Sequence, residues 1–99
     1  MMKHTTVKEL DQGLADAIKW AGAVRMFARA ALPPHTFVSR WADGLLAALQ
    51  AGQFNRAEDK ARLIEQALMK QPQALDGLTA AQREVEMILA WLNREEPEA

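Results

Sequence analysis

Residues 7–32, VKELDQGLADAIKWAGAVRMFARAAL, carry the pattern that decides the fold. Apolar residues recur on two positions of a seven-residue repeat, while charged residues lie mostly on the opposite side. This pattern predicts one amphipathic helix, roughly 39 Å long at a rise of about 1.5 Å per residue. The seam is Val7, Leu10, Leu14, Ala17, Ala21, Val24, Ala28 and Ala31, and Ile18, Trp20, Phe27 and Leu32 flank it.

Residues at the two ends of this segment indicate where the helix begins and where it ends. Thr6 and Glu9 have the spacing of a capping box, which places the first helical residue at Val7. Two prolines follow Leu32, and proline disfavours helical geometry in the residue before it. The helix is therefore expected to cover residues 7–32.

Three further amphipathic segments predict shorter helices near residues 35–51, 56–70 and 80–93, packed on the first helix as a spine. The start signals are Pro34 or Thr36, then the capping boxes Asn55–Glu58 and Thr79–Gln82, and the stop signals are Gly52 and Pro72. The apolar stripes are Phe37, Val38, Trp41, Leu45, Ala48 and Leu49; Ala57, Ala61, Ile64 and Leu68; and Ala81, Val85, Ile88, Leu89 and Leu92.

These segments predict an all-α fold, either a small four-helix bundle or a helical-hairpin array with one long N-terminal helix. Residues 1–99 are expected to form a single helical domain with frayed tails at 1–5 and 94–99. Gly13 and Gly22 lie inside the long helix, where each costs about 1 kcal/mol relative to alanine. We interpret both as positions that a neighbouring helix approaches closely.

The composition is that of an ordinary globular protein and excludes several classes of function. The chain is 49% hydrophobic and 25% charged, with a net charge of −1, so no bulk charge draws it to nucleic acid or to an anionic membrane. The absence of cysteine excludes disulfides, thiolate metal sites and a cysteine nucleophile. No apolar run is long enough for a signal peptide or a spanning helix, and we expect a cytoplasmic protein.

Few residues could carry catalysis. The two histidines, His4 and His35, have no partner at metal-ligand spacing, and no Gly-x-Ser-x-Gly elbow surrounds Ser39. The glycines do not cluster into a phosphate-binding loop. We identify no catalytic residue, metal ligand, cofactor or small-molecule substrate, and expect the protein not to be an enzyme.

One segment partly resembles a single tetratricopeptide repeat. Trp41, Gly52, Phe54 and Ala57 stand at the spacing of that family, and Ala67 and Pro72 match its closing residues. Three extra residues between Ala57 and Ala67 depart from the family pattern, as does the order Gly44-Leu45. The resemblance implies a helical hairpin that binds a peptide or a partner helix, and it implies no catalysis.

The aromatic residues suggest contact with another protein. The apolar face of the first helix is wider than three short helices can cover, and surplus apolar surface usually marks a partner or a homodimer seam. We therefore expect an adaptor, a chaperone-like or inhibitory subunit, or a self-associating bundle. The proposed contact residues are Trp20, Phe27, Met87 and Trp91, rimmed by Arg25, Arg29 and Arg40.

A DNA-binding regulator is the alternative. Residues 36–70 could form a helix-turn-helix that presents Asn55, Arg56, Lys60 and Arg62 to the duplex. Glu58 and Asp59 stand among these residues and would repel phosphate. Because the chain also lacks the basic excess that drives phosphate binding, nucleic acid is the weaker interpretation.

Overall fold

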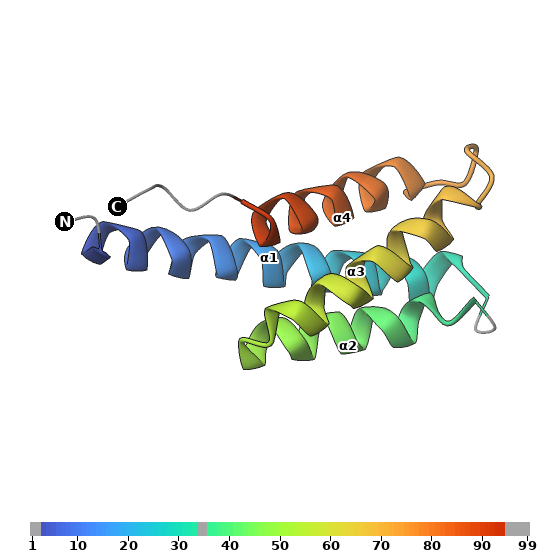
Figure 1. The fold of residues 1–99 in the computed structure, drawn as a ribbon. Helices are drawn as coiled ribbons and strands as arrows, with labels where there is room; N and C mark the ends of the chain where they lie inside the picture. Colours follow the sequence, from blue (N-terminus) through green and yellow to red (C-terminus); the bar gives the residue numbers. More distant parts are fainter. Residues whose placement is uncertain (1–2, 34–35, 95–99) are drawn as a thin grey trace.

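The computed structural model describes residues 3–33 and 36–94, with side chains from Gln12 onward (Figure 1). This part of the chain contains helices and no strand, which confirms the predicted all-α class. The helices are α1 Lys3–Ala31, α2 Val38–Ala51, α3 Phe54–Met69 and α4 Leu78–Leu92. The predicted signals at Pro34 and His35, and the acidic tail from Glu95, lie outside the described residues.

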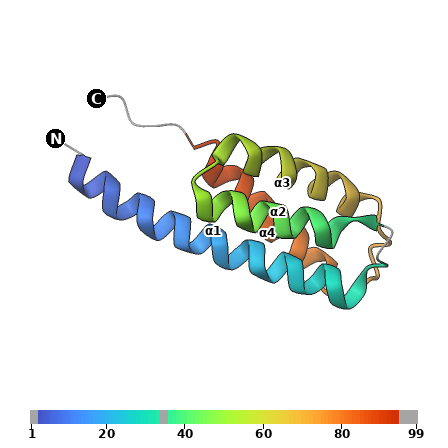
Figure 2. The same cartoon turned by 90° about the horizontal axis from the view of Figure 1, so that it is seen from below.

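Consecutive helices run side by side in opposite directions and form a four-helix bundle (Figures 1 and 2). Helix α1 packs against α2 and α4, and α3 packs against the same two helices from the opposite corner. The prediction that all shorter helices pack on α1 is therefore wrong for α3. A closed ring of four helices buries one stripe of each, so no single helix serves as the spine.

The long first helix is confirmed, and it extends beyond the others. It has 29 residues, whereas α2, α3 and α4 have 14, 16 and 15 residues. Figure 2 shows its N-terminal part continuing past the ends of the other three helices. Within the described residues, the contribution of the α1 segment to the core begins at Leu14, which is half-buried, and ends at Leu32.

The core is built from the predicted stripes. Alanine provides three of the five buried residues on the α1 side and two of the four on α3, whereas leucine, isoleucine and valine dominate α2 and α4. Each fully buried Leu, Ile or Val contributes about 1.5–3 kcal/mol. The buried residues are Ala17, Ala21, Val24, Ala28, Leu32, Val38, Ala42, Leu45, Ala48, Leu49, Ala57, Ala61, Ile64, Leu68, Leu78, Ala81, Val85, Ile88 and Leu89.

The predicted starts of α1 and α2 are wrong. Helix α1 begins at Lys3 and continues through Thr6, which is therefore not its N-cap. The side chains of residues 3–11 lie outside the described part, so the Thr6–Glu9 bond is untested. The hydroxyl of Thr36 donates to the Pro33 carbonyl at 2.8 Å, and the N-cap of α2 is Phe37.

The starts of α3 and α4 also differ from prediction, for one physical reason. Each helix begins two residues earlier than predicted, at Phe54 and Leu78, and neither has a side-chain cap bond. A cap bond is worth about 1 kcal/mol, while burying a leucine contributes about 1.5–3 kcal/mol. The bundle therefore takes the apolar residue into the helix, and the predicted caps Asn55 and Thr79 become ordinary helical positions.

The predicted stop signal of α2 is confirmed. Gly52 adopts a left-handed conformation at φ 75°, and the cap backbone donates to the carbonyls of Ala48 and Leu49. Such a conformation suits glycine because it has no Cβ. Helix α3 ends at Met69, three residues before Pro72, and the segment from 70 to 77 is irregular as expected.

The two glycines of α1 have different environments. A Cβ on Gly13 would overlap the indole of Trp91, whose Cδ1 lies 2.9 Å from that position. A Cβ on Gly22 would meet nothing within 4 Å. The interpretation as a close helix approach is therefore right for Gly13 and wrong for Gly22.

Candidate functional site

The predicted contact residues separate into two groups. Trp20, Phe27 and Trp91 are half-buried and pack against the core. Phe27 lies against Gly77 at the start of α4, where a Cβ would sit 3.1 Å from its Cδ1. These side chains belong to the side of the bundle where α1 meets α4, and Met87 on α4 is half-buried as well.

Trp91 links three parts of the molecule. Its ring lies over Gly13 of α1 and makes an edge-to-face contact with Phe54 of α3, with the centroids 5.4 Å apart. The guanidinium of Arg94 covers the ring at 4.7 Å from its centroid. Because three elements already cover this ring, it closes one end of the bundle; contact with a partner stays a prediction.

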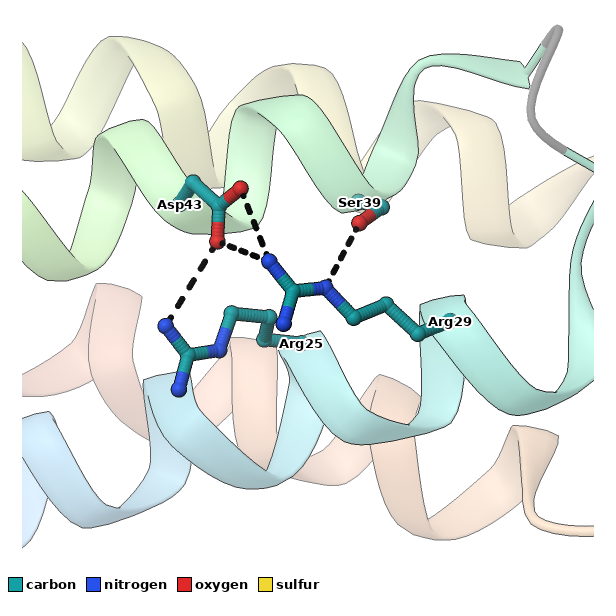
Figure 3. Close-up of polar contacts among 4 residues, drawn as sticks. All are labelled: Arg25, Arg29, Ser39 and Asp43. Carbon is teal, nitrogen blue, oxygen red and sulfur yellow. Dashed lines mark hydrogen bonds and ion pairs between the residues drawn. The ribbon is translucent and has the colours of Figure 1, made fainter.

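Arg25 and Arg29 lie on the other side of α1 and face α2 (Figure 3). Nη2 of Arg29 donates to both carboxylate oxygens of Asp43, at 3.1 and 3.2 Å, and its Nε donates to the Ser39 hydroxyl at 3.3 Å. Nη1 of Arg25 reaches the same carboxylate at 3.5 Å. One carboxylate is thus shared by two guanidinium groups, which gives the cluster a net charge of +1.

Arg40 belongs to a third contact, with Phe37. Its guanidinium lies 5.5 Å from the centroid of the Phe37 ring, which is also 6.4 Å from the ring of Trp41. Phe37 has a φ of 61°, and within the described residues no other non-glycine residue has a positive φ. This left-handed conformation costs roughly 1–2 kcal/mol for a residue with a Cβ.

Phe37 was expected in the core, and this expectation is wrong. The side chain is 49% exposed. Phe37 is the N-cap residue of α2, and its backbone is left-handed where the chain enters that helix. The strain is therefore not offset by full burial of the ring.

A groove lies beside this residue, between the start of α2 and the second half of α3. It has a volume of about 280 Å³, and we call it the α2–α3 groove. Leu63 on its wall is 40% exposed. Its lining is Thr36, Trp41, Leu63, Gln66, Ala67, Lys70 and Gln71.

Sequence reasoning missed most of this groove. Leu63 lies off the α3 stripe, and an apolar residue off the stripe is a signal that could have been used. Trp41 was assigned to the core, and Lys70 only to the end of a helix. The groove arises from the packing of α2 on α3, which the pattern of either helix alone does not contain.

The charges are divided between two sides of the bundle. Lys70 lines the α2–α3 groove, Arg40 lies over the Phe37 ring, and the side chain of Lys60 lies 3.2 Å from the position of a Cβ on Gly44. A second hollow of about 180 Å³, between α3 and α4, is acidic instead. It is lined by Glu65, Met69, Gln82 and Glu86.

Two carboxyl groups near α4 have shifted pKa values. A hydrogen bond from Arg62, and a second from Asn93, hold the pKa of Glu58 below its ordinary value. Burial raises the pKa of Glu84 because the charged form loses hydration. Neither group lies beside a nucleophile or a metal cluster among the described residues, so the shifts do not indicate catalysis.

The residues of the DNA-binding alternative are placed as follows. Asn55 and Arg56 are exposed at the start of α3, and Lys60 lies against α2. Arg62 is held by Glu58 at 2.8 Å, which confirms the predicted ion pair. Helices α2 and α3 pack as antiparallel neighbours (Figure 1), whereas the two helices of a helix-turn-helix cross at about 90–120°.

Two negative findings limit the chemistry of the described residues. From residue 12 to 94, apart from 34 and 35, no group of three or more His, Cys, Asp or Glu side chains could hold a metal ion. In the same part of the chain, no helix is both long and apolar enough to cross a membrane. Compared with family models, with curated proteins and with solved structures, the chain has no significant match.

Proposed function

We propose that the chain is a non-enzymatic protein-binding module that receives its partner in the α2–α3 groove. The observation that carries this proposal is Phe37, an aromatic residue that is both strained and half-exposed. Strained residues of this kind concentrate at functional sites. Its ring contacts that of Trp41, and Trp41 lines the groove together with the exposed Leu63.

The chemistry of the groove suits a side chain of another protein. Aromatic and arginine residues dominate the binding energy of many interfaces. Trp41 lines the groove, and its ring contacts Phe37, over which the Arg40 guanidinium lies. Its volume accepts one or two apolar side chains, and amides at Gln66 and Gln71 can bond a partner's backbone. A small surface of this kind suits a weak or transient complex.

Several roles agree with this proposal. An adaptor, a chaperone-like subunit or an inhibitory subunit would each need such a surface, and a homodimer would place a second copy there. The α2–α3 hairpin partly resembles a tetratricopeptide repeat, and that resemblance implies that it would bind a helix of the partner. A cytoplasmic location belongs to the same proposal.

A selection of helical peptides on the immobilised protein tests the proposal. We expect selected peptides to bind the wild type and to lose binding at least about tenfold to Leu63→Asp, because the charge enters the groove. The matched control is Met69→Asp, which places the same charge at an exposed α3 position outside the groove. Peptides that respond equally to both variants, or to neither, would contradict the proposal.

DNA binding is the competing outcome. A mobility shift with random duplex DNA at low salt gives phosphate contacts their greatest strength. We expect no shift. A shift that disappears in Arg56→Glu with Lys60→Glu, and not in Leu63→Asp, would replace the protein-binding proposal.

A further inference from the structure

We propose that copies of this chain associate edge to edge, with the arginine pair between α1 and α2 of one copy bound to the acidic hollow between α3 and α4 of the next. The occupant of each edge is thus a second copy of the chain. This inference is independent of the proposed function, because neither edge contains a residue that lines the α2–α3 groove. It is carried by the positions of the two edges and by their opposite charge.

The two edges lie opposite one another in the bundle. Helix α1 packs against α2 and α4, and α3 packs against the same two helices, so the contact of α1 with α2 is diagonal to that of α3 with α4. We call the first contact the basic edge and the second the acidic edge. The basic edge is Arg25, Arg29, Ser39 and Asp43, and the acidic edge is Glu65, Met69, Gln82 and Glu86.

Both edges also lie at the same level along the bundle. Arg29 is in the last turn of α1, and Ser39 is in the first turn of α2. Met69 is the last residue of α3, and Gln82 is in the second turn of α4. Figure 1 shows the C-terminal ends of α1 and α3 at the same end of the bundle. Two copies in the same orientation can therefore meet side by side at these edges.

The basic edge has more cation than acid. Arg25 and Arg29 share the carboxylate of Asp43, which leaves a net charge of +1 (Figure 3). Among the described residues Arg25 makes no side-chain hydrogen bond, and its contact with Asp43 is an ion pair of 3.5 Å. The two arginine side chains are 35% and 57% exposed, so a second carboxylate can reach the pair. It would restore one acid for each guanidinium, and a carboxylate can bind a guanidinium through two parallel hydrogen bonds.

The acidic edge has carboxylates without cations. Glu65 and Glu86 line its hollow, which has a volume of about 180 Å³. Within the part of the chain that the structure describes, neither carboxylate forms an ion pair. Arg62 on α3 does not neutralise them, because Glu58 already holds its guanidinium at 2.8 Å. Each edge therefore supplies the charge that the other lacks, which is the complementarity that selects a partner and its orientation.

Met69 adds an apolar contact to these charges. Its side chain is 69% exposed and lines the same hollow as the two carboxylates. A thioether chain adapts to an irregular surface, and the stems of arginine side chains can cover apolar area while the guanidinium stays polar. In the associated copies Met69 lies on the stems of Arg25 and Arg29. Exposed ion pairs contribute little one by one, so the contact is weak and sensitive to salt.

The contact repeats because its two surfaces are different. A copy bound through its basic edge still presents a free acidic edge on the opposite side, so copies form an open row rather than a closed dimer. The charge of the helices agrees with this arrangement. From residue 12 onward, α1 and α2 carry four basic and two acidic residues, whereas α3 and α4 carry four basic and five acidic residues.

Sedimentation velocity of the wild-type chain measures the association. We expect the mean mass to rise beyond that of a dimer as the concentration approaches about 1 mM in about 50 mM salt. It should return to the mass of one chain in about 500 mM salt, because salt screens exposed charges. Amide chemical shifts should change with concentration at both edges, at Ser39 and Asp43 as well as at Met69 and Glu86.

Charge reversal at one edge identifies the contact. Glu86→Arg, at an exposed position of α4, should weaken association at least about tenfold. The matched control Asp59→Arg makes the same change of charge at an exposed position of α3 outside both edges, and it should leave association unchanged. Isotope-labelled Glu86→Arg mixed with unlabelled wild type should show shifts at Ser39 and Asp43 and none at Met69, because only its basic edge can still bind.

Several results would overturn the inference. One is a mass that stays at that of a single chain up to about 1 mM. Others are an association that high salt does not weaken, and an equal effect of the two charge reversals. Shifts at Trp41 and Leu63 would place the second copy in the α2–α3 groove, and a dimer with shifts at one edge alone would make the contact symmetric. Failure of this inference leaves the proposed function in place, since the peptide selection concerns the groove alone.

Discussion

At the scale of single residues, the two glycines inside α1 show that packing requires glycine at one position and not at the other. Gly13 is required because the Trp91 indole occupies the space of a side chain, while Gly22 faces open space. Both residues lie inside α1 next to its seam, and neither occupies a seam position. The difference comes from a residue of α4 almost eighty positions away, which no local pattern reveals.

A pair of alanine substitutions separates these roles. Gly22→Ala should raise the free energy of unfolding by about 0.5–1 kcal/mol because alanine favours the helix and meets no neighbour. Gly13→Ala should lower it by about 1–3 kcal/mol, because the overlap with Trp91 exceeds the gain in helix propensity. Urea denaturation followed by far-UV circular dichroism measures both. Equal effects of the two substitutions would contradict the observed packing.

The strain at Phe37 predicts an unusual order of stabilities. Phe37→Ala loses the contact with Trp41 and keeps the left-handed backbone, whereas Phe37→Gly loses the same contact and removes the strain. We expect the glycine variant to be more stable than the alanine variant by about 1 kcal/mol. Thermal unfolding of the two variants tests this, and an alanine variant of higher melting temperature would show that the backbone is unstrained.

At the scale of elements, the apolar stripe of α3 could be predicted in full and that of α4 in part, since Leu78 was missed and Leu92 is half-buried, whereas the starts of the helices could not be predicted. Periodicity reports which residues face a core, and this is why Ala57, Ile64 and Val85 were placed correctly. A capping box reports only a local preference. At Leu78 the gain from burial is larger than that preference, so tertiary packing sets the boundary.

Substitutions at the start of α4 compare the effect of burying Leu78 with the effect of capping by Thr79. Leu78→Ala should cost about 2–5 kcal/mol because it leaves a cavity in the core. Thr79→Ala should change stability by less than about 0.5 kcal/mol, since its side chain is exposed and makes no cap bond. Equilibrium denaturation measures both free energies of unfolding. A large loss of stability in Thr79→Ala would show that the Thr79 side chain does cap the helix.

The raised pKa of Glu84 predicts a pH effect on α4. Its pKa in the folded state lies above the ordinary value of 4.5, so the unfolded chain releases the proton first as the pH rises. Stability contributed by the protonated group is therefore lost as the pH rises through the folded-state pKa. Relative to the wild type, Glu84→Gln should gain stability between about pH 3 and about pH 7. A constant difference across that range would contradict the shift.

At the scale of the whole molecule, the fold class and the helix count follow from sequence, and the candidate site does not. The α2–α3 groove combines Trp41 from α2 with Leu63 from α3, and Lys70, at the end of α3, also lines it. Sequence reasoning selected Arg25, Arg29 and Arg40 from their type alone. It could not show that these lie on the α2 side while Trp20, Phe27 and Trp91 pack towards the core.

Removal of residues 1–11 tests how the bundle depends on the extended part of α1. Among the residues whose side chains are described, the core starts at Leu14 and the first contact of α1 with α4 is at Gly13, so we expect the shortened chain to keep its free energy of unfolding within about 1 kcal/mol. Its helical signal should fall in proportion to the residues removed. A larger loss of stability would show that residues 1–11 contribute to the stability of the folded protein.

The neighbouring positions of Gly13 and Trp91 have a mechanical consequence. Handles attached at Gln12 and Arg94 would pull at the same end of two adjacent antiparallel helices. Tension then peels α4 away from α1 turn by turn, and each contact bears the load alone. In optical tweezers the bundle should open at a lower force in this direction than when it is stretched from Gln12 to Gly77, where the turns of both helices resist together.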